Sequence, residues 1–212
     1  GNAAEALSKK FTEMQDDSEV TAGFMWQKTT RESKKYQLRG EILSFIPVEK
    51  NVEVMMVTIT NTGRMAQTVT PTAAIPLYGR SADNIRDHRH VTSLLHRIET
   101  TDTGVLVTPT LSFDERGHQV NHMTYYCVGW SGNGEKPVDF YPTAEDFVGE
   151  GGNFERPYAI VKNAEGVKAG TRIEGLEAVG GLHFSEVTLG PEEECSYLIF
   201  TGITEDIQEI RN

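Results

Sequence analysis

Short runs in which apolar and polar residues alternate fill most of the chain after residue 35. Gly, Asn and Asp separate these runs, and Thr and Val are abundant within them. Successive side chains of a strand face opposite sides of a sheet, so this alternation indicates half-buried strands. The pattern predicts an all-β fold, an antiparallel sandwich or barrel. The predicted strands are 36–46, 52–60, 66–77, 91–99, 105–111, 122–130, 182–189 and 195–203.

Two hairpins are predicted from turn residues between neighbouring runs. The turn Asn61-Thr62-Gly63 should return 66–77 antiparallel to 52–60, because Asn and Gly tolerate positive φ. Residues 100–104 should join the strands on either side of them in the same way. A loop too rich in Gly to carry a strand is expected from Gly149 to Pro157.

Helices are predicted only at the margins and at one internal site. Leu7, Phe11 and Met14 form one apolar helical face. An apolar group follows at Phe24-Met25-Trp26, and after it a polar stretch through Lys35. Thr143 should cap a short helix whose first turn is acidic. Thr204 should cap a last helix with Ile207 and Ile210 on its apolar face. The expected division is 1–35 for an N-terminal helix and extension, 36–203 for the sandwich, and 204–212 for a truncated linker helix.

Composition narrows the possible partners and locations. The chain has 212 residues, with 31 acids against 20 bases and a net charge of −11, which argues against nucleic acid and anionic membrane as partners. No apolar stretch approaches the roughly 20 residues that span a bilayer, and no secretory leader opens the sequence. Cys127 and Cys195 lie in apolar runs. We interpret them as two thiols of a reducing, cytoplasmic compartment, although their spacing leaves a bridge possible.

One basic segment interrupts this acidic chain between Arg80 and Arg97. It holds four Arg and three His against two Asp. Arginine forks suit phosphate, carboxylate or vicinal hydroxyls, and Asp or Asn side chains suit sugar hydroxyls. The alternative is a surface loop whose Arg and Asp neutralise one another. The candidate carbohydrate- or phosphate-binding residues are Arg80, Asp83, Asn84, Arg86, Asp87, His88 and Arg89.

Aromatic residues and histidines offer weaker candidates. Trp130 adjoins a Gly-rich turn and could stack on a sugar ring, whereas Tyr125 and Tyr126 fit a core or its rim better. His88 and His90 would share one face of a strand, but no carboxylate follows at metal-ligand spacing. We therefore predict no metal site and no cofactor.

Three segments, in this order and with these gaps, resemble the N-terminal β-sandwich domain of glycoside hydrolase family 94. They are VMMVTITNTGRMAQTVTPTAA at 54–74, FVGEGGNFERPYAI at 147–160 and VTLGPEEECSYLIFTGI at 187–203. The run at 80–98, RSADNIRDHRHVTSLLHRI, is most similar to the branch that acts on β-1,2-linked oligoglucans. The order Leu189-Gly190-Pro191 departs from the commoner Pro-Gly order at that turn.

The resemblance implies a large antiparallel two-sheet supersandwich that precedes a helical linker and an (α/α)6 barrel. In that family the barrel carries the catalytic acid, and a sandwich loop reaches the active site, often across a dimer interface. No residue here matches the catalytic acid. The expected function is therefore that of a non-catalytic domain of a glycoside phosphorylase, with β-glucan and inorganic phosphate as partners through the barrel, and a homodimer.

Two other functions remain open from the residues. An aldose-epimerase-like enzyme shares this architecture and would need a His acid and a Glu base facing one sugar. The candidates for that pair are His88, His90 or His122 with Glu177 or Glu186. A free-standing carbohydrate-binding module would need neither, and would bind glucans by itself.

Overall fold

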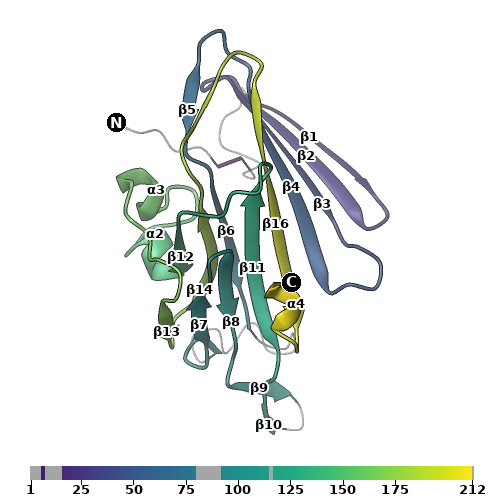
Figure 1. The fold of residues 1–212 in the computed structure, drawn as a ribbon, viewed down its shortest axis with the longest axis vertical. Coiled ribbons are helices and arrows are strands. Elements are labelled where there is room, and N and C mark those ends of the chain that lie inside the picture. The colour runs from purple at the N-terminus through teal and green to yellow at the C-terminus, as the bar shows by residue number, and fades with distance from the viewer. Residues whose placement is uncertain (1–5, 8–15, 80–91, 115–116, 212) are drawn as a thin grey trace.

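The protein is a β-sandwich in this computed structural model, which describes residues 6–7, 16–79, 92–114 and 117–211. A nine-stranded sheet forms one layer in the order β1-β2-β3-β4-β16-β11-β8-β7-β13, and a three-stranded sheet, β12-β14-β6, packs against part of it (Figure 1). All the strand pairs are antiparallel. The prediction of an all-β, two-sheet antiparallel sandwich is confirmed.

The strands of the large sheet come from both ends of the chain. Their bounds are β1 Asp17–Gly23, β2 Trp26–Ser33, β3 Leu38–Phe45, β4 Val52–Asn61, β7 Arg97–Thr100, β8 Gly104–Val107, β11 Thr124–Ser131, β13 Arg172–Glu174 and β16 Glu194–Thr204. The three-stranded sheet contains β6 Thr72–Leu77, β12 Asp139–Thr143 and β14 Ala178–His183. Two further pairs are β5 Gln67–Val69 with β15 Val187–Leu189, and β9 Leu111–Asp114 with β10 Gly117–Val120.

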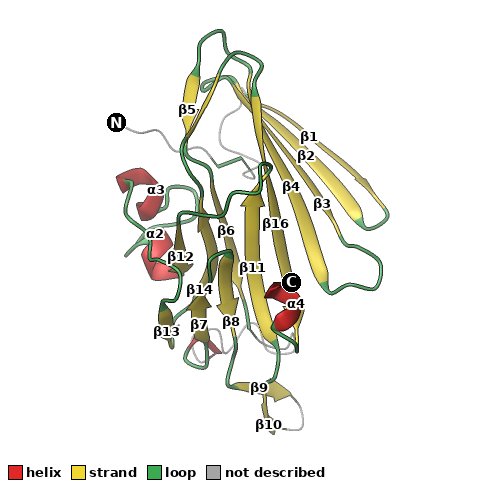
Figure 2. Ribbon diagram, in the orientation of Figure 1, coloured by secondary structure: helices red, strands yellow, loops and turns green. Residues whose placement is uncertain are grey.

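Helices are short and lie outside the sandwich, as Figure 2 shows in red. They are α2 Ala144–Val148, α3 Tyr158–Lys162 and α4 Gln208–Arg211. α2 begins as predicted, because the Thr143 hydroxyl accepts a hydrogen bond from the Asp146 amide at 3.0 Å. The predicted loop between α2 and α3 is also present.

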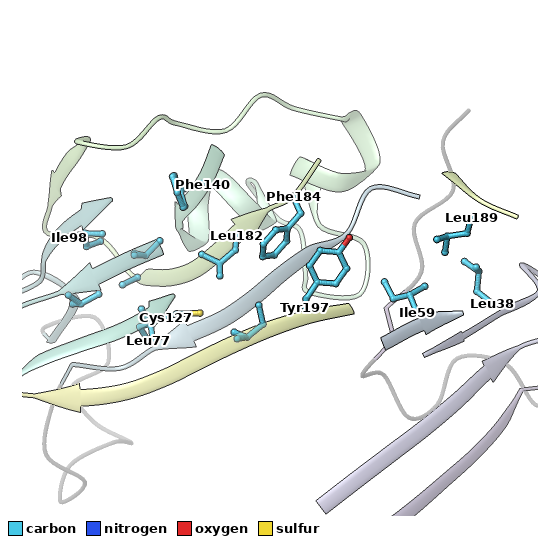
Figure 3. Packing of buried hydrophobic residues seen from close by; sticks show 14 residues of the cluster. Leu38, Ile59, Leu77, Ile98, Cys127, Phe140, Leu182, Phe184, Leu189 and Tyr197 are labelled. Carbon is cyan, nitrogen blue, oxygen red and sulfur yellow. The ribbon is translucent and has the colours of Figure 1, made fainter. Parts of the chain in front are cut away.

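The core lies between the two sheets. Buried side chains from β6, β8, β11, β12, β14 and β16 meet there, among them Cys127, Leu182 and Tyr197 (Figure 3). Gly180 of β14 makes this close approach possible, since a Cβ on it would lie 2.2 Å from Cys127 Cβ. At the other end Leu38 and Ile59 pack with Leu189, which extends the core under β15. Both cysteines are free thiols.

The predicted start of the strands near Tyr36 is wrong, because β1 and β2 form a hairpin from Asp17 to Ser33. Every residue of β1 is exposed. The buried residues of β2 are Arg31 and Ser33. The Arg31 guanidinium pairs with the Asp16 carboxylate at 2.6 Å, with side-chain exposures of 4% and 8%. Neither strand therefore carries the apolar alternation that marks a half-buried strand. The predicted helix over Leu7, Phe11 and Met14 falls mostly outside the described residues.

The predicted return of 66–77 against 52–60 is also wrong. This stretch contains two strands, and β5 pairs with β15 whereas β6 pairs with β14 in the opposite layer. Pro71 separates them and cannot donate to a ladder, which explains the break. The strand β14, which pairs with β6, ends at His183. The predicted strand 182–189 is therefore also divided, between β14 and β15.

The remaining corrections are to element bounds. The hairpin around 100–104 is confirmed, but its first strand begins only at Arg97, after a helical turn at 92–95. The last helix begins at Gln208 rather than just after Thr204. The Asp206 carboxylate accepts from the Gln208 amide at 2.9 Å, while Thr204 accepts from the Asp206 amide. Asp206 is thus the side chain that caps the helix.

Candidate functional site

Seven of the eight predicted binding residues lie at 80–91, outside the described residues. The structure does place the residue before that segment. Gly79 lies two residues after the end of β6, and a Cβ on it would lie 3.3 Å from His96 Nε2 and 2.5 Å from Pro109 Cγ. The described residue before the segment therefore lies at a rim of the sandwich near the start of β7 and the end of β8.

His96 at this rim is a packed residue. Its side chain is 3% exposed, and Nδ1 lies 3.1 Å from the Leu176 carbonyl oxygen. Burial lowers the pKa of His96, so the ring stays neutral at physiological pH. His96 is therefore both packed and hydrogen-bonded within the fold.

Trp130 is the one predicted binding residue that the structure describes. It lies on β11 opposite Leu198 of β16, and its ring meets Phe200 edge to face, with centroids 5.8 Å apart. Direct pairing places Trp130 and Leu198 on one face of the sheet, away from the core that Cys127 faces. Its ring is therefore part of the outer apolar surface of the large sheet and does not line the cavity formed beside β12 and α2.

That cavity lies between β12, α2, the start of α3 and the segment after α3. It encloses about 450 Å³ and opens to solvent. Its lining residues, as far as the chain is described, include four carboxylates and two tyrosines but no Lys or Arg. The lining residues are Phe140, Tyr141, Glu145, Asp146, Gly149, Glu150, Tyr158, Ala164, Glu165, Gly166 and Val167.

Local structure fixes the walls of this cavity. The Tyr141 hydroxyl donates to the Ala164 carbonyl oxygen at 2.7 Å, which ties the segment after α3 to β12. Burial, and to a lesser degree the charge of Asp139, raises the pKa of Tyr141 to about 12. Thr143 donates its hydroxyl proton to Asp146 Oδ2 at 2.7 Å, so this carboxylate is held at the mouth.

A His–carboxylate pair lies beside the same wall. His183 Nδ1 and Asp139 Oδ1 are 2.6 Å apart, and Lys168 Nζ lies 3.9 Å from Asp139 Oδ2. The His183 and Tyr141 rings have centroids 5.8 Å apart. Both side chains of the pair are mostly buried, with exposures of 17% and 8%. This arrangement orients the imidazole of His183.

The chain matches the profile of the glycosyl hydrolase 94 supersandwich domain over residues 4–212. The chain belongs to this family. No curated protein matches it. The match covers nearly the whole sequence, and the antiparallel two-layer fold agrees with it. The resemblance to a family 94 supersandwich is therefore confirmed, whereas the β-1,2-oligoglucan branch stays a prediction.

Among the described residues of the supersandwich domain, no group of three or more His, Cys, Asp and Glu is arranged to hold a metal ion. The described helices include none long and apolar enough to cross a membrane. Of the epimerase candidates, His88 and His90 fall outside the described residues, and His122 is exposed just before β11. The His183–Asp139 pair involves neither Glu177 nor Glu186.

Sequence reasoning missed the acid-lined cavity. Its residues come from three separate segments, 140–150, 158 and 164–167, and only tertiary packing brings them together. The acids of 145–146 were visible as helix-capping charges and Glu150 as part of a Gly-rich loop. No local signal joins these segments, because the two apolar residues at 159–160 are too few to indicate a helix or the wall on which it packs.

Proposed function

We propose that this chain is the non-catalytic N-terminal sandwich domain of a glycoside phosphorylase acting on β-linked gluco-oligosaccharides. The family match over residues 4–212 carries the proposal. The catalytic acid would lie in a barrel domain outside this sequence. The sandwich would shape the sugar and phosphate pocket and supply a dimer surface. The β-1,2 branch is the substrate class we favour, from the sequence of 80–98.

Phosphate and sugar are the two substrate groups, and two parts of the domain suit them differently because these parts differ in charge. Four carboxylates line the cavity beside α2, so a phosphate dianion would meet repulsion there. The arginines at 80, 86 and 89 carry the opposite charge, and their forks match phosphate oxygens. We therefore propose that the segment 80–91 reaches the pocket of the barrel. A cytoplasmic location is proposed as well, supported by the two free thiols.

The test of the non-catalytic role is phosphorolysis by the chain alone. The purified domain is incubated with β-1,2-gluco-oligosaccharides and inorganic phosphate, and glucose 1-phosphate is measured with a coupled assay. We expect no release above the protein-free control. Release that scales with the concentration of the domain would show that the chain is catalytic by itself, and the proposal would be wrong.

A free-standing carbohydrate-binding module is the second candidate, and the acid-lined cavity is the observation that favours it. A volume of about 450 Å³ falls in the range of small-molecule sites. Carboxylates accept hydrogen bonds from sugar hydroxyls, and Tyr158, which is 53% exposed, offers a ring face. Calorimetry with gluco-oligosaccharides separates the two functions, since a domain that needs the barrel should bind them weakly.

The calorimetric test has a matched pair of variants. Tyr158→Ala removes the exposed ring at the cavity, while Tyr78→Ala removes a ring of similar exposure, 56%, at the other rim. If the domain binds sugar through the cavity, only Tyr158→Ala should weaken it. Tight binding lost only in Tyr158→Ala would favour the module over the phosphorylase domain.

A further inference from the structure

The outermost strand of the large sheet is an open edge. β1 ends the strand order, and no other described strand pairs with its outer side. All seven of its residues are exposed, and its register with β2 is continuous from Asp17 to Gly23. Natural edges are usually protected by charged side chains, Pro, a bulge or a covering element. β1 has no Pro and no bulge, and its charged residues are Asp17 and Glu19, so it is a template for a strand that keeps acids away from these two.

In an antiparallel ladder, successive residues direct their N–H and C=O groups alternately toward one neighbouring strand and toward the other side. This alternation decides which groups of β1 face the open edge. The Ile46 amide donates to the Met25 carbonyl oxygen at 3.0 Å, so position 25 bonds toward β3 and Trp26 bonds toward β1. Trp26 pairs with Gly23, and each second residue of β1 from there likewise faces β2. The N–H and C=O groups left for the open edge belong to Ser18, Val20 and Ala22.

We propose that a second copy of this chain pairs with β1 antiparallel about a two-fold axis at Val20. Val20 then faces the partner's Val20, and Ser18 faces the partner's Ala22. The edge groups of both copies meet one another in this register, with two hydrogen bonds for each of three residue pairs, about six in all. Of the function proposed above, this inference depends only on the existence of a dimer surface. It adds that the surface lies at the β1 edge.

Charge and length select this register among the symmetric ones. With the axis at Val20, Asp17 faces the partner's Gly23 and Glu19 faces the partner's Thr21, so no acid opposes an acid. An axis at Ser18 or Glu19 would set carboxylates directly opposite each other, which destabilises a sheet. An axis at Thr21 or Ala22 would shorten the overlap. The Val20 axis pairs all seven residues of β1, and Val20 itself is 58% exposed.

The first experiment removes one edge amide that the single chain does not use. Val20→Pro deletes an N–H that points away from β2, and proline is tolerated at such edge positions. Val20→Thr keeps the amide, the branched side chain and the exposure, and is the matched control. Mass is measured by light scattering after gel filtration across a wide concentration range. We expect dimers for the wild type and Val20→Thr, and a dissociation constant at least about tenfold higher for Val20→Pro, with circular dichroism unchanged.

The second experiment reads the register directly. Val20→Cys brings two sulfurs together across the axis, since directly opposed residues have Cα atoms about 5.5 Å apart. Asp17→Cys lies on the same exposed strand, but its two copies would be about 20 Å apart. We expect an oxidative cross-link only for Val20→Cys. Cys127 is fully buried and Cys195 lies opposite Ile59 within the sheet, and the parent protein controls for both.

The outcomes separate this edge from the wider proposal. A wild-type monomer at every concentration would overturn both the edge pairing and the proposed dimer surface. A dimer that persists unchanged in Val20→Pro, or a cross-link in Asp17→Cys but not Val20→Cys, would overturn the edge pairing and leave a dimer surface elsewhere. Neither result bears on phosphorolysis, which is assayed separately.

Discussion

Asn61 is the buried polar residue whose replacement should cost most stability. Its side chain is fully buried at the end of β4. Nδ2 donates to the carbonyl oxygens of Met65 at 2.8 Å, Leu189 at 2.9 Å and Gly190 at 3.1 Å. Oδ1 accepts from the Gly63 amide at 2.8 Å and the Gln67 side-chain amide at 2.9 Å. One amide thus joins the turn after β4 to the turn between β15 and β16.

The size of the effect follows from how many of these bonds are buried. The bonds to Leu189 and Gly63 are buried, and the other three are partly buried. Each buried group left without a partner costs about 1–3 kcal/mol, whereas partly buried groups regain water. Asn61→Ala orphans two buried groups and should lower the free energy of unfolding by about 3 kcal/mol.

Asn61→Asp tests the polarity of the site at nearly constant shape. Its carboxyl could still accept from Gly63 and Gln67, but an ionised oxygen would face the three carbonyl oxygens that Nδ2 now contacts. The folded state should therefore favour the protonated acid, with a pKa above its unfolded value of about 3.9. Stability of this variant should be greatest below that value and be lost as pH rises.

The assay is equilibrium urea unfolding followed by circular dichroism and tryptophan fluorescence. Thr68→Ala is the control, because its hydroxyl meets that of Thr188 at 2.9 Å across β5 and β15 in an exposed bond of the same region. The control should change stability by about 0.5 kcal/mol or less. If Asn61→Ala lay within the error of this control, the role assigned to the Asn61 amide would be refuted.

Three further predictions follow from close packing and buried charge. Gly104→Ala should cost more than about 3 kcal/mol or prevent folding, because its Cβ would lie 2.0 Å from the Cys127 carbonyl oxygen. Gly134→Ala is the control in the same urea assay. Gly134 has a φ of 81° and open space around it, so this variant should cost about 1 kcal/mol. Burial raises the pKa of Cys127 to about 12, so iodoacetamide at pH 8 should not label it in the folded protein, and mass mapping of labelled Cys127 would contradict this. The contribution of the buried, neutral Cys127 thiol to the free energy of unfolding is complete below the pKa of an unfolded thiol, about 8.5. This contribution declines as pH rises toward 12, which urea melts between pH 7 and about 10 will show. Asp16→Ala removes one charged partner of the buried Arg31 guanidinium, which also donates to the Ala6 carbonyl oxygen, and should cost about 2 kcal/mol; a melt equal to wild type would contradict that.

The sequence predicted those strands in which one face packs on the core and the other does not. Residues 52–61 and 194–204 lie at the centre of the large sheet, where one face packs on the core, and their apolar pattern gave nearly correct bounds. The Thr143 cap and the hairpin around 100–104 were predictable because both depend on residues adjacent in sequence.

Strands that lack this contrast were not predictable. β1 is exposed on both faces, and β2 directs a charged Arg31 inward, so both were interpreted as a polar extension. The pairing of β5 and β6 depends on partners more than 100 residues away, at 178–189, and no local signal specifies it. The family resemblance came from ordered motifs, and it gave the layer architecture that local patterns could not.

Two parts of this domain carry opposite charges, so we expect one to bind sugar and the other phosphate. Kinetics of the whole enzyme can test this expectation. The cavity beside α2 is lined by acids without a basic residue, so it suits neutral sugar hydroxyls. The segment at 80–89 carries three arginines, so it suits phosphate. In a phosphorylase that contains this domain, Arg86→Ala should raise the KM for phosphate more than the KM for oligosaccharide, and Glu150→Gln should do the reverse. Equal effects of both variants on both constants would mean that charge does not separate the two substrates on this domain.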